Sequence, residues 1–153
     1  MKKFKFTLQT VHNVREMRQE KEHLRLTELQ NELNQAQARI VEIERQQQIA
    51  LEKYSERLKK GESINAYELE LDSLHLTELD RLKRDALEIL EQKKKDCEKQ
   101  TETVAAATRA VKITNRLREN QAERHKLETE RIEQNQIDEL VSANFARLMS
   151  ETK

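Results

Sequence analysis

The sequence predicts an all-α fold: a long antiparallel two-helix coiled coil, or α-helical hairpin, with an overhanging C-terminal helix. Three observations predict it. The 153 residues include no proline, one glycine (Gly61) and many Glu, Lys, Arg, Gln, Leu and Ala. Proline and glycine are the residues that most often end a helix, and the abundant residues are good helix formers. We therefore expect one hairpin over residues 1–153, with a helix at about 4–59, a turn at about 60–64 and a helix at about 65–149.

Composition favours a narrow seam over a thick core. Charged residues make up 38% of the chain and hydrophobic residues 35%, and the formal net charge is zero. A seam between two helices needs only about two apolar residues in seven. Disordered chains usually combine few apolar residues with a high net charge, which is absent here. A coiled coil therefore fits this composition better than a globular domain or a disordered chain.

The first helix carries apolar residues at spacings of three and four, which is typical of a coiled-coil seam. The expected seam consists of Leu26, Leu29, Leu33, Ala36, Ile40 and Ile43, with Gln47, Ala50 and Tyr54 in phase. Nearer the N-terminus we expect a change of phase to a separate stripe of Phe4, Leu8, Val11 and Val14. Residues 15–23 hold only Met17 as an apolar residue, so looser packing is expected there.

The turn is expected at Gly61, which can adopt the left-handed conformation that ends a helix. Asn65 with Glu68, or Ser63 alone, can cap the helix that follows. The expected seam of the second helix consists of Leu69, Leu76, Leu79, Leu82, Leu87, Leu90, Cys97, Val104 and Val111.

A short turn makes the two helices antiparallel, so that the numbers of facing residues sum to roughly 122–126. Leu26 should lie near Cys97, and Leu33 near Leu90. Ile43 should lie near Leu79 and Leu82. About thirty residues of the second helix then extend past the first, which is about 45 Å of helix. This overhang has an apolar stripe of Leu127, Ile132, Ile137, Leu140, Val141, Phe145 and Leu148. The stripe indicates partner binding, and a solvated tail is the alternative.

Nothing in the sequence indicates catalysis. One glycine cannot build a phosphate-binding loop, and a two-helix hairpin offers no pocket that would shift the pKa of a catalytic carboxylate. The histidines are His12, His23, His75 and His125, and none stands four residues from another. We therefore expect no enzyme activity, no cofactor, no metal and no small-molecule substrate.

Cys97 is the only cysteine, so no intrachain disulfide can form. Its place on the expected seam favours a small buried apolar residue over a reactive thiol.

The remaining composition bears on location and partners. No apolar run reaches the length of a signal peptide core or a membrane span, so we expect a soluble, cytoplasmic protein. The N-terminal 25 residues are modestly basic but lack the dense basic run of a DNA-reading helix. The sequence therefore argues against nucleic-acid binding.

Two terminal patterns resemble a known family. The start, Phe4-x-Phe6-x-Leu8-Gln9-x-Val11-x-x-x-Arg15, resembles the opening of FliJ proteins of the bacterial flagellar export apparatus. The polar run at 130–140 ends in Ile137-Asp138-Glu139-Leu140 and resembles the C-terminal signature of that family. Chain length and the break near residue 61 also match, so the resemblance covers the whole chain.

The resemblance implies a non-enzymatic stalk and adaptor. FliJ-like proteins are antiparallel coiled coils similar to the gamma stalk of rotary ATP synthases. They bind and stimulate the hexameric export ATPase (FliI), contact the export gate (FlhA) and escort export chaperones. The implied location is the cytoplasm at the flagellar base, peripheral to the inner membrane.

The resemblance also implies contact residues. Paired helix ends engage the ATPase in the family, and the matching residues here are Phe4, Leu8, Arg15, Arg131, Gln134, Asp138 and Glu139. The gate contact of the family is an aromatic residue followed four residues later by Leu. The matching positions here are His75 and Leu79, where the aromatic is missing. Two alternatives stay open: the equivalent stalk of a virulence-type III secretion system, and a generic coiled-coil scaffold or dimerisation module.

Overall fold

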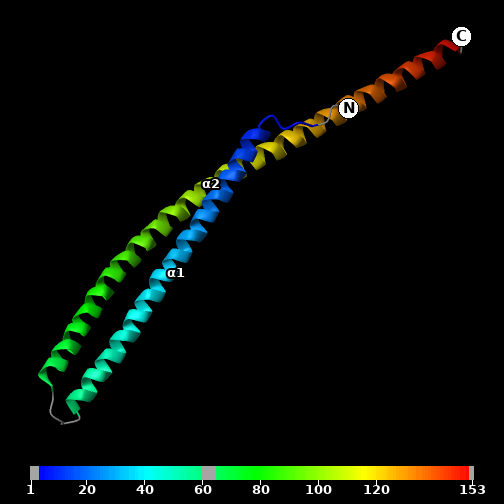
Figure 1. The fold of residues 1–153 in the computed structure, drawn as a ribbon. Coiled ribbons are helices and arrows are strands. Elements are labelled where there is room, and N and C mark those ends of the chain that lie inside the picture. The colour runs from blue at the N-terminus through cyan, green and yellow to red at the C-terminus, as the bar shows by residue number, and fades with distance from the viewer. Residues whose placement is uncertain (1–3, 60–64, 152–153) are drawn as a thin grey trace. The chain divides into compact units, whose positions relative to one another are not determined.

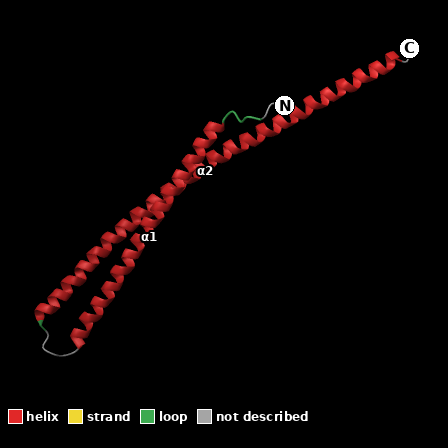
Figure 2. Ribbon diagram, turned by 45° about the vertical axis from the view of Figure 1, so that its right-hand side comes forward, coloured by secondary structure: helices red, strands yellow, loops and turns green. Residues whose placement is uncertain are grey.

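The structure is a computed structural model that describes residues 4–59 and 65–151. It contains two helices, α1 (Gln9–Lys59) and α2 (Ala66–Glu151), which pack against each other (Figure 1). No strand occurs among these described residues, as Figure 2 shows by colour. The predicted all-α helical hairpin is confirmed. The expected turn at Gly61 lies outside the described residues.

The start of α1 differs from the prediction. The helix begins at Gln9 and not at about residue 4, and it follows a turn in which the Gln9 amide donates to the Phe6 carbonyl (3.2 Å). Phe6 is buried, with 8% of its surface exposed. The turn before the helix therefore accompanies the burial of an aromatic side chain that the helical pattern alone did not predict.

The start of α2 is capped as the sequence indicates. The Asn65 side-chain oxygen accepts a hydrogen bond from the Tyr67 amide (3.1 Å), and the Asn65 carbonyl accepts one from the Leu69 amide (3.2 Å). Such a cap satisfies amide groups that the first helical turn leaves without partners. Glu68 adds a negative charge at the positive end of the helix dipole.

The chain divides into two compact units, each built from part of α1 and part of α2. The first, which we call the hairpin unit, is Glu20–Ala105. The second, which we call the terminal unit, combines Met1–Gln19 with Ala106–Lys153.

The hairpin unit has an apolar seam. Ile40, Ile43 and Ala86 form a buried cluster, against which Leu82 and Leu90 pack. Leu29, Leu79 and Val104 are also buried, and Leu26, Leu33 and Cys97 are half-buried. Full burial of a Leu or Ile side chain contributes about 1.5–3 kcal/mol. Leu87 is 44% exposed, so its assignment to the seam was wrong, and the neighbouring Ala86 occupies that position.

Polar pairs between the helices of the hairpin unit show the antiparallel register. Glu32 pairs with Lys93, Glu44 with Lys83, and the Arg57 guanidinium lies 3.3 Å from Asp72. The hydrogen bond from Lys93 lowers the pKa of Glu32 and raises that of Lys93. These pairs follow the expected pairing of α1 with α2 to within a few residues.

The terminal unit has a polar seam. Its buried residues are Phe6, His12, Ala107, Val111 and Thr114. The expected stripe of Phe4, Leu8, Val11 and Val14 is exposed, so the predicted change of phase was wrong. Instead the positions in heptad phase with Leu26 and Leu29 continue toward the N-terminus as His12, Arg15 and Gln19. The α2 residues on the opposite side are small, and long polar side chains of α1 reach the α2 backbone and hydroxyl groups.

Within the terminal unit, α2 continues past the start of α1 (Figure 1). Residues 130–150, which we call the C-terminal extension, are all helical and exposed. No helix in the described ranges is both long enough and apolar enough to cross a membrane.

Candidate functional site

The C-terminal extension exposes large apolar side chains on one side of α2. Ile137, Leu140, Val141, Phe145 and Leu148 are each 53–65% exposed. At about 100° per residue, these five residues share one side of the helix, which we call the C-terminal face.

The C-terminal face does not continue the seam of the terminal unit. It is rotated by roughly 140° about the α2 axis from the side that carries Ala107, Val111 and Thr114. A longer α1 in the same position would therefore pack on a different side of α2. The C-terminal face is a second, separate apolar surface of this helix.

The four polar residues assigned to the extension are all exposed. Gln134 lies at the edge of the C-terminal face and donates to the Asp138 carboxylate (3.0 Å). Arg131 and Asp138 flank the same edge, whereas Glu139 lies on the opposite side of the helix. One partner surface on the C-terminal face can therefore meet Arg131, Gln134 and Asp138 but not Glu139.

The N-terminal candidates lie beside an earlier stretch of α2. Phe4 and Leu8 are each 37% exposed, and the Phe4 ring meets His125 edge-on with centroids 5.7 Å apart. Arg15 is half-buried, and its guanidinium donates to the Ala110 carbonyl (3.0 Å). The structure thus leaves Phe4 and Leu8 partly exposed and uses Arg15 to join α1 to α2. Residues 131–139 lie about 9–21 Å further along the α2 axis than His125.

A buried polar pair lies at the centre of the terminal unit. His12 and Thr114 are each 1% exposed, and the His12 Nδ1 lies 2.8 Å from the Thr114 hydroxyl oxygen. That hydroxyl also donates to the Val111 carbonyl (3.0 Å). The buried His12 Nε2 lies 3.1 Å from a Glu16 carboxylate oxygen, without hydrogen-bond geometry. Sequence reasoning missed this pair, although its signal was present: His12 stands two heptads before Leu26.

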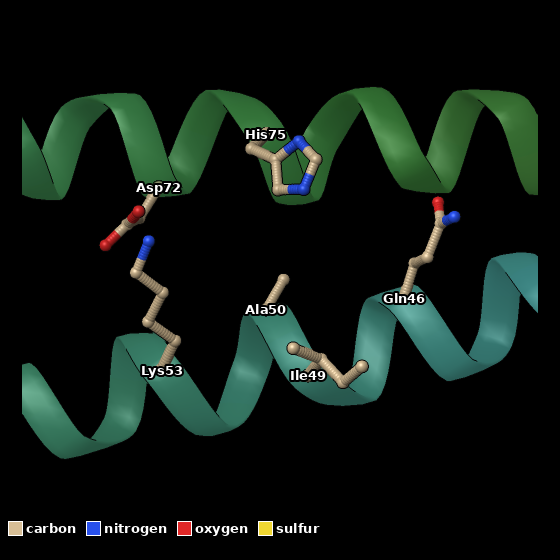
Figure 3. A pocket seen from close by; sticks show the side chains of 6 residues that line it. All are labelled: Gln46, Ile49, Ala50, Lys53, Asp72 and His75. Atoms are coloured by element: carbon tan, nitrogen blue, oxygen red, sulfur yellow. The ribbon is translucent and has the colours of Figure 1, made fainter.

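The hairpin unit has a groove of about 300 Å³ between α1 and α2 (Figure 3). It is lined by Gln46, Ile49, Ala50, Lys53, Asp72 and His75. Lys53 and Asp72 point toward one another across it, and His75 lies beside them on α2 (Figure 3). His75 is exposed, but Leu79 is 2% exposed. The two residues assigned to the gate contact therefore do not share a surface.

Within residues 4–59 and 65–151, no group of three or more His, Cys, Asp or Glu side chains could hold a metal ion.

Comparison with protein families decides the assignment. A family model described as flagellar FliJ protein matches residues 4–150. The chain belongs to the FliJ family. It is therefore a stalk-like protein of flagellar type III export. No curated protein matches it, and no solved structure does.

Family membership directs attention to residues of this FliJ-family chain that the sequence reasoning passed over. An aromatic residue followed four residues later by Leu, which positions 75 and 79 do not provide, occurs near the start of α2 as Tyr67 and Leu71. Tyr67 is 66% exposed, Leu71 47% and Leu74 59%. The spacing of Tyr67 and Leu71 can be read from the sequence, whereas the burial of Leu79 is visible only in the structure.

Proposed function

We propose that this FliJ-family chain is the non-enzymatic stalk and adaptor of the export ATPase. It binds and stimulates the FliI-like hexamer, contacts the FlhA-like export gate and escorts export chaperones, in the cytoplasm at the flagellar base. The observation that carries the proposal is the exposed C-terminal face in a chain that matches the FliJ family over residues 4–150.

On the C-terminal face, apolar and charged residues would contribute to ATPase binding in different ways. Burial of Val141 and Phe145 would supply affinity, because both are now more than 60% exposed. Arg131 and Asp138 at its edge would set the orientation, since charges at an interface act mainly on specificity and association rate. Phe4, which lies against His125, and the partly exposed Leu8 would add further apolar contact area.

The stimulation follows from symmetry. One helical stalk cannot make the same contacts with six equivalent subunits at once. A stalk that binds one conformation of a subunit more tightly than the other shifts that subunit toward the favoured conformation. The size of the shift is set by the difference between the two affinities. Weak, unequal contacts with a ring therefore suffice to promote turnover.

The gate contact is better assigned to Tyr67, Leu71 and Leu74 than to His75 and Leu79. These three exposed residues have i, i+4, i+7 spacing, which is how a helix presents anchors to an apolar groove. Leu79 would require separation of α1 from α2 to reach a partner, because it is 2% exposed. His75 adjoins the groove of Figure 3 and would lie at the rim of such a contact.

Substitution on the C-terminal face tests ATPase binding. In the full-length chain, Val141→Ser with Phe145→Ser should weaken binding to the export ATPase at least about tenfold, since each buried apolar side chain contributes about 1.5–3 kcal/mol. ATP hydrolysis measured against stalk concentration gives the readout. Val41→Ser is the matched control, because Val41 is 64% exposed on α1. Full stimulation by the double variant would refute the assignment of this face.

Substitution on α2 near Asn65 tests the gate contact. Tyr67→Ala with Leu71→Ala should abolish co-purification with the cytoplasmic domain of the export gate, whereas His75→Ala should reduce it only slightly. Circular dichroism should be unchanged, because all three residues are exposed. A larger loss with His75→Ala than with the double variant would return the contact to His75.

Chaperone escort is tested by co-purification of export chaperones with the unsubstituted chain. The scaffold alternative predicts self-association in sedimentation equilibrium and no effect on ATP hydrolysis. If both results were obtained, the proposed function would be refuted in favour of the scaffold.

A further inference from the structure

We infer that His12 and Thr114 are positioning residues: their buried bond pins residues 4–19 to α2 within the terminal unit. We call residues 4–19 the N-terminal segment. The two side chains meet across the helices with 2.8 Å between Nδ1 and the hydroxyl oxygen, and both are 1% exposed. They are the largest fully buried side chains of the described residues.

Apolar burial in the N-terminal segment is small. Phe6 is its buried apolar residue, while Leu8, Val11, Val14 and Met17 are 37–69% exposed. On α2 the facing buried apolar residues are Ala107 and Val111. The area removed from water is therefore much less than in a seam of Leu and Ile, and apolar burial stabilises roughly in proportion to area.

Polar bonds supply the remaining attachment. Besides the His12–Thr114 pair, Arg15 donates to the Ala110 carbonyl (3.0 Å) and Gln19 donates to the Thr108 hydroxyl (3.1 Å). Both of these are only part-buried, so water can replace them when the segment opens. The His12–Thr114 pair is sealed from water and is the one whose loss would leave a buried polar group unsatisfied.

The bond between the His12 Nδ1 and the Thr114 hydroxyl can be made in two ways. The hydroxyl can donate to an unprotonated Nδ1, or a protonated Nδ1 can donate to the oxygen while the hydroxyl donates to the Val111 carbonyl (3.0 Å). Removing the Thr114 hydroxyl destroys both arrangements and leaves the buried His12 Nδ1 without a partner, whereas the Thr114 hydroxyl can still donate to the Val111 carbonyl if His12 is removed. Replacing both by apolar side chains strands neither, and such replacement is often close to neutral.

The consequence for the stalk rests on the proposed function. Phe4 and Leu8 belong to the N-terminal segment, and Phe4 lies against His125 of α2. A closed segment places these apolar side chains at a defined point along α2. An open segment disperses them.

Hydrogen exchange of the full-length chain, followed by mass spectrometry, tests the inference. Thr114→Val keeps the shape of the side chain but strands the imidazole. Amides of residues 9–19 should then exchange roughly 5- to 100-fold faster, while those of residues 40–55 keep their rate. His12→Leu with Thr114→Val should restore slow exchange. Thr77→Val is the control for the same chemical change, because Thr77 is exposed on α2.

Two results would overturn the inference: unchanged exchange in Thr114→Val, or faster exchange in the double variant than in the single one. ATP hydrolysis by the export ATPase is a separate readout. Loss of stimulation in Thr114→Val and recovery in the double variant would support the link to function. Normal stimulation with fast exchange would leave the pinning role intact and refute only the link.

Discussion

His12 and Ile40 occupy equivalent heptad positions of α1, four heptads apart, yet their surroundings differ. Ile40 belongs to a buried cluster with Ile43 and Ala86, where apolar area leaves water. His12 instead forms a buried hydrogen bond with Thr114. The cluster around Ile40 stabilises the fold. The His12–Thr114 pair disfavours incorrect pairing of the helices, because a buried polar group without a partner raises the free energy.

Truncation of Ile43 tests the apolar cluster. Ile43→Ala should lower the free energy of unfolding by about 2–4 kcal/mol, because the side chain is 4% exposed and its loss leaves a cavity. Urea denaturation followed by circular dichroism measures it. Leu74→Ala, at a 59% exposed position, should change stability by less than about 0.5 kcal/mol. Equal effects of the two changes would contradict the assigned core.

Glu42 gives a prediction about pH. Hydrogen bonds from Arg45 and then Gln46 lower the pKa of Glu42 to about 2. A lowered folded-state pKa means that the stabilisation is present above about pH 4–5, where the unfolded carboxyl is ionised, and is lost as pH falls through about 2. Carboxyl carbon NMR shifts should show this titration, and Arg45→Gln should raise the pKa. An ordinary glutamate pKa in the unsubstituted chain would contradict the prediction.

Among the elements, α2 shows how a long helix is sustained where no other helix covers it. Pairs four residues apart lie along this part of the helix, including Lys126 with Glu130 (3.9 Å) and Gln134 with Asp138 (3.0 Å). Each such pair adds only about 0.2–0.5 kcal/mol, but the chain repeats them. No proline interrupts the backbone hydrogen bonds, so the helix continues through the C-terminal extension.

The cap of α2 can be tested by substitution. Asn65→Ala should destabilise the chain by about 1 kcal/mol, because the Tyr67 amide loses its side-chain partner. Asn65→Ser should have little effect, since serine caps equally well. Thermal denaturation and exchange of the amides at residues 67–69 give the two readouts. If Asn65→Ser were as damaging as Asn65→Ala, the side chain would act in some way other than as a cap.

For the chain as a whole, the stability resides in the paired parts of α1 and α2. Ending the chain after residue 130 should leave the unfolding midpoint nearly unchanged, because residues 130–150 bury no side chain. The helical circular dichroism should fall only in proportion to the residues removed. A large drop in the midpoint would show that the C-terminal extension packs against something in solution, a second copy included, and sedimentation would identify it.

Heptad spacing in the sequence predicted the buried apolar residues but not the partners of the polar ones. Leu29, Ile40 and Ile43 were identifiable because apolar residues at heptad spacing have one common explanation. The bond from Arg15 to the Ala110 carbonyl was not predicted, because spacing does not show what lies opposite a charged residue. Leu79 was assigned to the gate and to the seam alike, and only its burial separates the two roles.

The order of residues was enough to establish the helical class and most of the apolar seam of the hairpin unit, since these depend on local backbone preference and on spacing along one helix. It left the cap of α2 open between Asn65 and Ser63, and the structure shows the bond from Asn65. The folded arrangement was needed to establish that His12 faces Thr114, that the Phe4 and Val11 stripe is exposed, and that the C-terminal face lies on a different side of α2 from the seam of the terminal unit. A polar side chain becomes a favourable seam residue only when a specific partner across the seam completes its hydrogen bond. The identity of that partner depends on both helices at once, so it cannot be read from either helix alone.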